Sequence, residues 1–128
     1  MTHLMKHLLA LTFAVLLLVA AARAHAERSG RRISYEYVLL QEVNDSIEQA
    51  RRLATVVSHR LSHVNLIPMN PIEGSPLAPP SKARAQAFQS VLQAAGVSTT
   101  IRATRGLDID AACGQLRARQ LQATPSPV

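Results

Sequence analysis

Apolar and polar residues alternate over residues 32–40. Every second position from Ile33 to Leu39 is aliphatic or aromatic, whereas Ser34 and Glu36 fall on the opposite face. A period of two residues is typical of a half-buried strand. The pattern therefore predicts a strand in this segment.

Two later segments show the helical period instead. The first follows Asp45, which has capping-box spacing to Glu48. Its apolar positions are Ile47, Ala50, Leu53, Ala54, Val57 and Leu61. The second follows Ser81, a predicted N-cap, and Gly96 is its predicted end. Its apolar stripe is Ala85, Phe88, Val91, Leu92 and Ala95. Both segments predict amphipathic helices.

Short apolar segments follow each of these helices. Val64–Ile67, ended by Pro68, predicts a buried parallel strand, and residues 97–102 predict another. The proline-rich stretch 68–80 predicts an irregular loop. The β-α-β-α-β order indicates an α/β fold with a parallel sheet, whose ligands bind beyond the carboxyl ends of the strands. Three strands leave an edge and an apolar face uncovered, so we expect the body to be part of a larger fold.

We expect residues 1–26 to form a separate hydrophobic, helical leader. Lys6 precedes the apolar run 8–22, and Ala24-His25-Ala26 offers small residues at a cleavage spacing. The run is shorter than the ~20 residues of a membrane-spanning helix. This favours a signal peptide over a transmembrane anchor, so we expect no stable membrane partner. An artefactual leader from a misassembled gene is the other interpretation. Residues 117–128 are expected to be a disordered tail, which leaves residues 27–116 as the body.

The chain is basic, with a formal net charge of +6, and most of its cations are Arg. This charge is compatible with a nucleic-acid partner, although many domains without one are equally basic. A single Cys excludes an internal disulfide framework and any metal site built from several Cys of this chain. His59 and His63 are four residues apart in the predicted first helix, but no third ligand accompanies them, so we expect no metal there.

Cys113, between Ala112 and Gly114, has little side-chain bulk beside its thiol. A reactive thiol and an inert buried Cys are both compatible with this context. Four segments are more specific. They are Tyr35-Glu-Tyr-Val38, Glu42-Val-Asn-Asp45, Asn65-Leu-Ile-Pro-Met-Asn-Pro71 and Thr104-Arg-Gly-Leu-Asp-Ile-Asp-Ala-Ala-Cys-Gly-Gln-Leu116.

With these segments, residues 31–116 resemble the C-terminal part of the RlmN family. That family consists of radical S-adenosylmethionine methyltransferases that modify carbon 2 of an adenosine in 23S rRNA and, in some members, in tRNA. The resemblance implies the last β-α-β-α-β portion of an open radical-enzyme (β/α) barrel. It implies that Cys113 is the S-methylcysteine carrier and that Asn70 belongs to the S-adenosylmethionine site.

The family also uses a [4Fe-4S] cluster, but the chain has no Cys-x-x-x-Cys-x-x-Cys motif to hold one. We therefore expect the chain alone to be inactive, either as a fragment or as one half of an enzyme whose partner chain carries the cluster. The resemblance places the protein in the cytoplasm, and a genuine leader would place it outside. Alternatives are an exported non-enzymatic binding module and an RNA-binding remnant.

Overall fold

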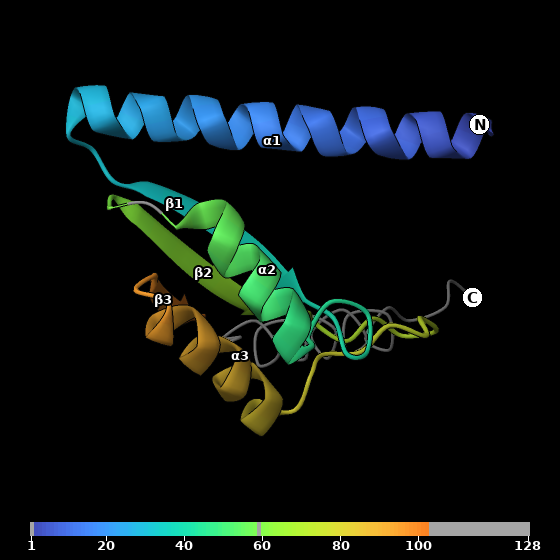
Figure 1. The fold of residues 1–128 in the computed structure, drawn as a ribbon. Coiled ribbons are helices and arrows are strands. Elements are labelled where there is room, and N and C mark those ends of the chain that lie inside the picture. The colour runs from blue at the N-terminus through green and yellow to red at the C-terminus, as the bar shows by residue number, and fades with distance from the viewer. Residues whose placement is uncertain (1, 59, 103–128) are drawn as a thin grey trace, which may run out of the picture.

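The computed structural model of the protein describes residues 2–58 and 60–102, and the structural statements below concern those residues. Its elements are α1 (His3–Ser29), β1 (Ile33–Leu39), α2 (Ile47–Val57), β2 (Ser62–Pro68), α3 (Lys82–Ala94) and β3 (Ser98–Ile101). The helix α1 extends alongside the body as a separate rod (Figure 1). The other elements form two layers, the sheet and the helices α2 and α3 (Figure 1). The predicted leader helix and β-α-β-α-β order are confirmed.

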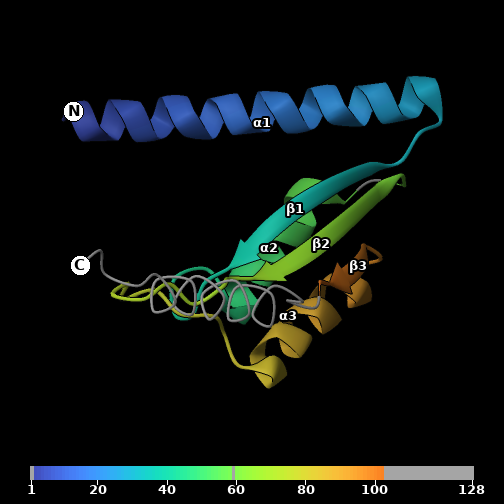
Figure 2. The same cartoon turned by 180° about the vertical axis from the view of Figure 1, so that it is seen from behind.

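The strands form one parallel sheet in the order β1-β2-β3. Tyr35 of β1 lies opposite Val64 of β2, which in turn lies opposite Thr99 of β3. Both α2 and α3 cover the same face of the sheet, and the other face carries no described helix (Figures 1 and 2). This arrangement is the expected one for a portion of a barrel with helices on its outer side.

The core lies between the covered sheet face and the two helices. Its largest fully buried side chains include Phe88, Leu92, Leu39 and Leu66. Tyr37 is half-buried and stacks on Phe88, with ring centroids 5.4 Å apart. The predicted apolar stripe of α3 is confirmed at Ala85, Phe88 and Leu92, whereas Ala95 is exposed because the helix ends at Ala94.

The helix α2 begins one residue later than the capping-box spacing predicted. The Ser46 side chain accepts a hydrogen bond from the Gln49 amide (3.2 Å), and Gln49 Oε1 accepts one from the Ser46 amide (3.0 Å). Asp45 is unavailable as a cap because its carboxylate is buried and accepts a hydrogen bond from the Glu42 amide. The predicted pair of Asp45 and Glu48 was therefore wrong by one position.

The same helix also ends earlier than predicted, at Val57. Leu61 lies in the turn before β2, where its carbonyl accepts a hydrogen bond from the Ile33 amide (2.8 Å). Strand pairing with β1 extends β2 back to Ser62, so His63 is a strand residue. The prediction that His63 lies in the first predicted helix was wrong.

Candidate functional site

Because the strands are parallel, their carboxyl ends meet at one edge of the sheet. Leu39 lies opposite Pro68 at this edge, and the Met69 amide donates to the Leu39 carbonyl (3.0 Å). The Arg102 amide donates to the Leu66 carbonyl (2.8 Å), which holds the end of β3 beside β2. In α/β sheets this edge is where ligands bind.

Asn70 is exposed and lies two residues beyond the end of β2, at this carboxyl edge. No helix or strand occurs between β2 and α3, as the prolines predicted. An exposed amide at this position can donate and accept hydrogen bonds with a ligand. Cys113, the other predicted site residue, lies outside the described residues.

A network of hydrogen bonds fixes the loop between β1 and α2 at the same edge. The Asn44 side chain accepts from the Leu40 amide and donates to the Val38 carbonyl, each at 2.8 Å. The Tyr37 hydroxyl donates to the Asn44 carbonyl at 3.0 Å. Burial raises the pKa of Tyr37, and the negative charge of Asp45 raises it further. These bonds hold the loop after β1 in one conformation.

Asp45 connects this loop to α3. Its side chain is 1% exposed, and Oδ2 lies 2.9 Å from Nε of Arg84, whose side chain is 44% exposed. Oδ1 accepts from the Glu42 amide at 3.0 Å, and Glu42 has a positive φ of 57°. The carboxylate therefore stabilises a left-handed residue in the loop and the position of α3 at once.

On the sheet face that lacks a described helix, hydrogen bonds between side chains connect all three strands. Asn65 Nδ2 donates to Glu36 Oε1 (2.9 Å), and the Thr100 hydroxyl donates to Asn65 Oδ1. The His63 ring contacts Ser98 Oγ (2.8 Å) and Thr100 Oγ1 (3.1 Å) through its two nitrogens. This face was expected to be apolar, and these residues show that its centre is polar.

The alternation in β1 placed Glu36 on this face, but nothing in the sequence linked it to His63, Asn65 or Thr100. Their contacts depend on the register between strands, which a single sequence leaves open. In a barrel with outer helices, this face points to the interior. We therefore include Glu36, Asn65 and Thr100 among the candidate functional residues that sequence reasoning missed.

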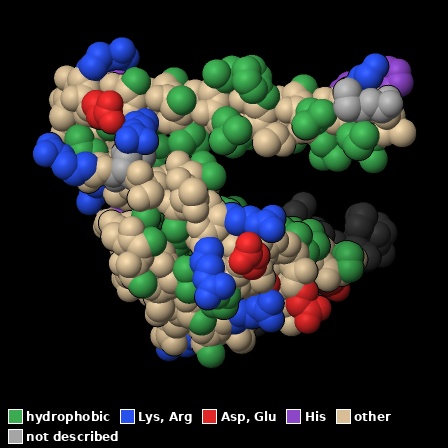
Figure 3. Space-filling view, viewed as in Figure 1, with side chains coloured by type: hydrophobic (Ala, Val, Ile, Leu, Met, Phe, Trp, Pro, Cys, Tyr) green, Lys and Arg blue, Asp and Glu red, His purple; other side chains and the backbone are tan. Residues whose placement is uncertain are grey.

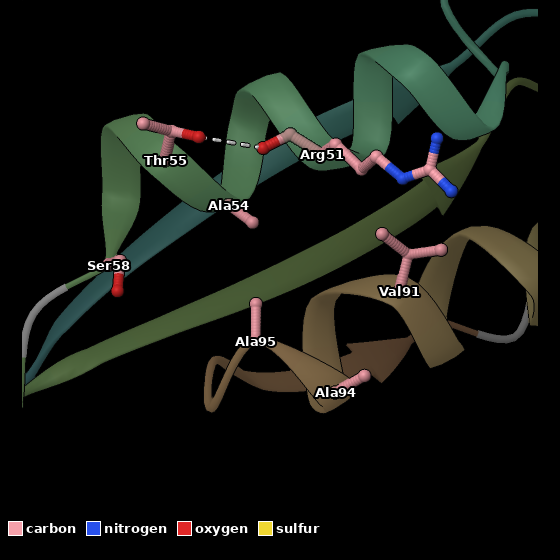
Figure 4. Close-up of a pocket in the computed structure, with 7 residues that line it drawn as sticks. All are labelled: Arg51, Ala54, Thr55, Ser58, Val91, Ala94 and Ala95. Carbon is pink, nitrogen blue, oxygen red and sulfur yellow. Dashed lines mark hydrogen bonds between the residues drawn. The ribbon is translucent and has the colours of Figure 1, made fainter.

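Two cavities lie beside α3. One, of about 690 Å³, opens near the carboxyl edge and is lined by residues that include Pro68, Lys82, Gln89 and Arg102. The cationic side chains of Lys82 and Arg102 could bind an anionic group. The other, of about 500 Å³, lies between α2 and α3, where Figure 4 shows Arg51 as its single charged side chain. Asn70 lines neither cavity.

No protein-family model matches the chain. A probable dual-specificity RNA methyltransferase RlmN of Symbiobacterium thermophilum is 49% identical over 102 residues, 79% of this chain. One from Prochlorococcus marinus strain MIT 9211 is 52% identical over 100 residues, 78% of this chain. Most of this chain is therefore similar to one segment of RlmN proteins.

A crystal structure agrees with this relationship to the RlmN family. A radical SAM methyltransferase from Sphaerobacter thermophilus is 47% identical with a TM-score of 0.69, over 77% of this chain and 29% of that one. The chain spans 28% of the length of both curated relatives named above. Residues that correspond to the rest of a complete RlmN protein are thus outside the match.

A complete radical SAM methyltransferase uses S-adenosylmethionine and a [4Fe-4S] cluster. Clusters of this kind are held by several Cys thiolates, and this chain has one Cys. Within residues 2–58 and 60–102, no group of three His, Cys, Asp or Glu side chains could hold a metal ion. The residues of this chain therefore do not fit the cluster.

Proposed function

We propose that residues 27–116 are the C-terminal part of the catalytic domain of an RNA methyltransferase that modifies carbon 2 of adenosine in 23S rRNA, with tRNA as a second substrate. The observation that carries this proposal is the 49% identity over 102 residues to a probable dual-specificity RNA methyltransferase. The open carboxyl edge, with Asn70 exposed on it, supports a ligand site at this position.

In this proposal Cys113 is the methyl carrier and Asn70 contacts S-adenosylmethionine. S-adenosylmethionine bound beside Asn70 would supply the methyl group, and the Cys113 thiolate would accept it, with S-adenosylhomocysteine as the leaving product. The thiol proton must be lost first, because the thiolate is the nucleophile. The Asn70 amide orients the cofactor by hydrogen bonding.

The chain by itself is proposed to be inactive, because its single Cys cannot supply the ligands of the cluster. The remaining part of the enzyme, on a second chain or in a repaired reading frame, supplies those ligands. The proposed location of the body is the cytoplasm, where ribosomal RNA is found. Residues 1–26 and 117–128 are proposed to lie outside the methyltransferase fold.

A chimera tests this proposal. Residues 31–116 replace the matching segment of the Sphaerobacter thermophilus enzyme, and 2-methyladenosine is measured in 23S rRNA and tRNA by mass spectrometry. The chimera is expected to methylate 23S rRNA, whereas the chimera with Cys113→Ala is expected to yield no product. A chimera that binds its cluster and S-adenosylmethionine but methylates no RNA would refute the proposal.

The Cys113→Ser chimera is a matched control, since it keeps the size of the side chain and replaces the sulfur. It is expected to bind S-adenosylmethionine as well as the unsubstituted chimera and to form no methylated protein. The Asn70→Ala chimera is expected to keep the methylation reaction but to need more S-adenosylmethionine. If Asn70→Ala left the KM for this cofactor unchanged, its proposed contact would be wrong.

A further inference from the structure

The helix α1 exposes apolar side chains on every side. Leu8, Leu9, Leu11 and Phe13 are all more than half exposed, although they point in different directions around the helix. None of the most apolar stretch of α1 is buried against the body. A helix that is apolar all round is normally enclosed by protein or by lipid, and the described body encloses only the carboxyl end of α1.

The helix α1 is long enough to cross the hydrocarbon core of a bilayer. It spans 27 residues, which corresponds to about 40 Å of helix. The hydrocarbon core of a membrane is about 30 Å thick. Lys6 lies near the amino end, where a long cationic side chain can extend to the headgroups. The apolar run 8–22 can therefore be extended toward His3 to give a full span.

The distribution of cations around the apolar run is uneven. Lys6 precedes it, whereas Arg23, Arg28, Arg31 and Arg32 follow it. Figure 3 shows Lys and Arg side chains gathered at the end of α1 that joins the body, with mostly hydrophobic side chains between the two ends. Segments rich in Lys and Arg remain on the cytoplasmic side of a membrane. The charge pattern thus opposes export of the body.

The structure also opposes cleavage after Ala26. The helix continues through this position to Ser29, and Ala26 is fully buried against the body. The Gly30 amide donates to the Ala26 carbonyl at 2.9 Å, and Gly30 has the left-handed conformation (φ 68°) that ends the helix. Because a peptidase binds its substrate in extended form, this end of α1 would have to unfold before cleavage.

From these observations we propose that α1 is an uncleaved membrane anchor, with its amino end outside and the body on the cytoplasmic side. The partner is a phospholipid bilayer with anionic headgroups, which attract the Arg residues that follow the span. This topology makes a hydrophobic leader compatible with a body related to RNA-modifying enzymes. It does not rest on the proposed methyltransferase activity.

The test expresses the full chain in a bacterium, with alkaline phosphatase or green fluorescent protein fused after Val128. The intact chain is expected in the membrane fraction after an alkaline carbonate wash, with a mass that includes residues 1–26. The fluorescent fusion is expected to be bright and the phosphatase fusion inactive. Cleavage after Ala26 with active phosphatase would overturn the proposal, as would a soluble chain or a soluble oligomer.

A charge variant tests the orientation separately from the attachment. The triple substitution R28Q, R31Q and R32Q removes three exposed cations. It is expected to increase phosphatase activity several-fold, because some of the molecules insert in the opposite orientation and place the fused phosphatase outside. The matched variant R28K, R31K and R32K keeps the charge and is expected to behave like the original chain. Equal phosphatase activity in the two variants would refute the role of the Arg residues.

Discussion

Substitution of Asp45 tests how the loop at the carboxyl edge is held. Asp45→Ala removes a buried carboxylate that accepts a hydrogen bond from the Glu42 amide (3.0 Å) and pairs with Arg84 (2.9 Å). A hydrogen bond to a charged group contributes about 1.5–3 kcal/mol. The half-exposed Arg84 adds up to about 1 kcal/mol. We therefore expect the free energy of unfolding to fall by about 2–4 kcal/mol.

Two variants serve as controls for this prediction. Asp45→Asn keeps an oxygen for the Glu42 amide and is expected to cost about 1–2 kcal/mol, since it loses only the charge. Arg52→Gln breaks a pair with Glu48 that has a similar distance of 3.2 Å but exposed partners (76% and 61%). It is expected to cost less than about 0.5 kcal/mol.

Urea unfolding of the full chain in a mild detergent, followed by circular dichroism, gives the free energy for each variant. The expected order of destabilisation is Asp45→Ala, then Asp45→Asn, then Arg52→Gln. If Asp45→Ala lowered the unfolding free energy no more than Arg52→Gln, burial of the carboxylate would not be what stabilises the loop. The explanation of the shifted helix cap would then fail as well.

Three further predictions follow from other contacts of the body. The pKa of Tyr37 is raised above 10.0 in the folded chain, so the free energy of unfolding is expected to be intact below pH 10 and to fall as pH rises toward the folded pKa. In Tyr37→Phe, urea unfolding at increasing pH should show a smaller fall in this free energy. Gly96 has a φ of +81° with open space at its Cβ position. Gly96→Val is therefore expected to lower the unfolding free energy by about 1–2 kcal/mol, and Gly96→Asn by less, because Asn tolerates this conformation better. Equal losses in the two variants would show that backbone conformation is not the cause. Thr100→Val removes the hydroxyl that donates to Asn65 and is expected to lower the unfolding free energy by about 1 kcal/mol in the same assay. An unchanged unfolding midpoint would mean that the polar contacts on the sheet face that lacks a described helix contribute no stability.

The two proposals about this protein are physically independent. The methyltransferase proposal rests on the relationship of the body to the RlmN family and on the carboxyl edge of the sheet. The anchor proposal rests on α1, in which Ala26 is the buried residue. The chimera lacks α1 and the topology test needs no activity, so either proposal can fail while the other stands.

Several features of the fold were predictable from the sequence because their causes are local. The Ser81 cap and the Gly96 end of α3 depend on side chains within a few residues of the helix termini. The two faces of β1 follow from its alternation alone. The position of Asn70 at the carboxyl edge also followed from a strand that ends at Pro68. The single Cys, which excludes a cluster held by this chain, is a matter of composition.

Only the tertiary structure decided the features that depend on partners far apart in the chain. His63 had the spacing of a helix residue, but pairing with β1 places it in β2, where it contacts Ser98 and Thr100. Asp45 had the spacing of a cap, but the energy of burying its charge is offset by Arg84, which is 39 positions later. Local periodicity and cap chemistry constrain neighbouring residues, whereas strand register and buried charge pairs are set by which segments come together. For that reason the elements could be predicted from this sequence, but the polar contacts that connect them could not.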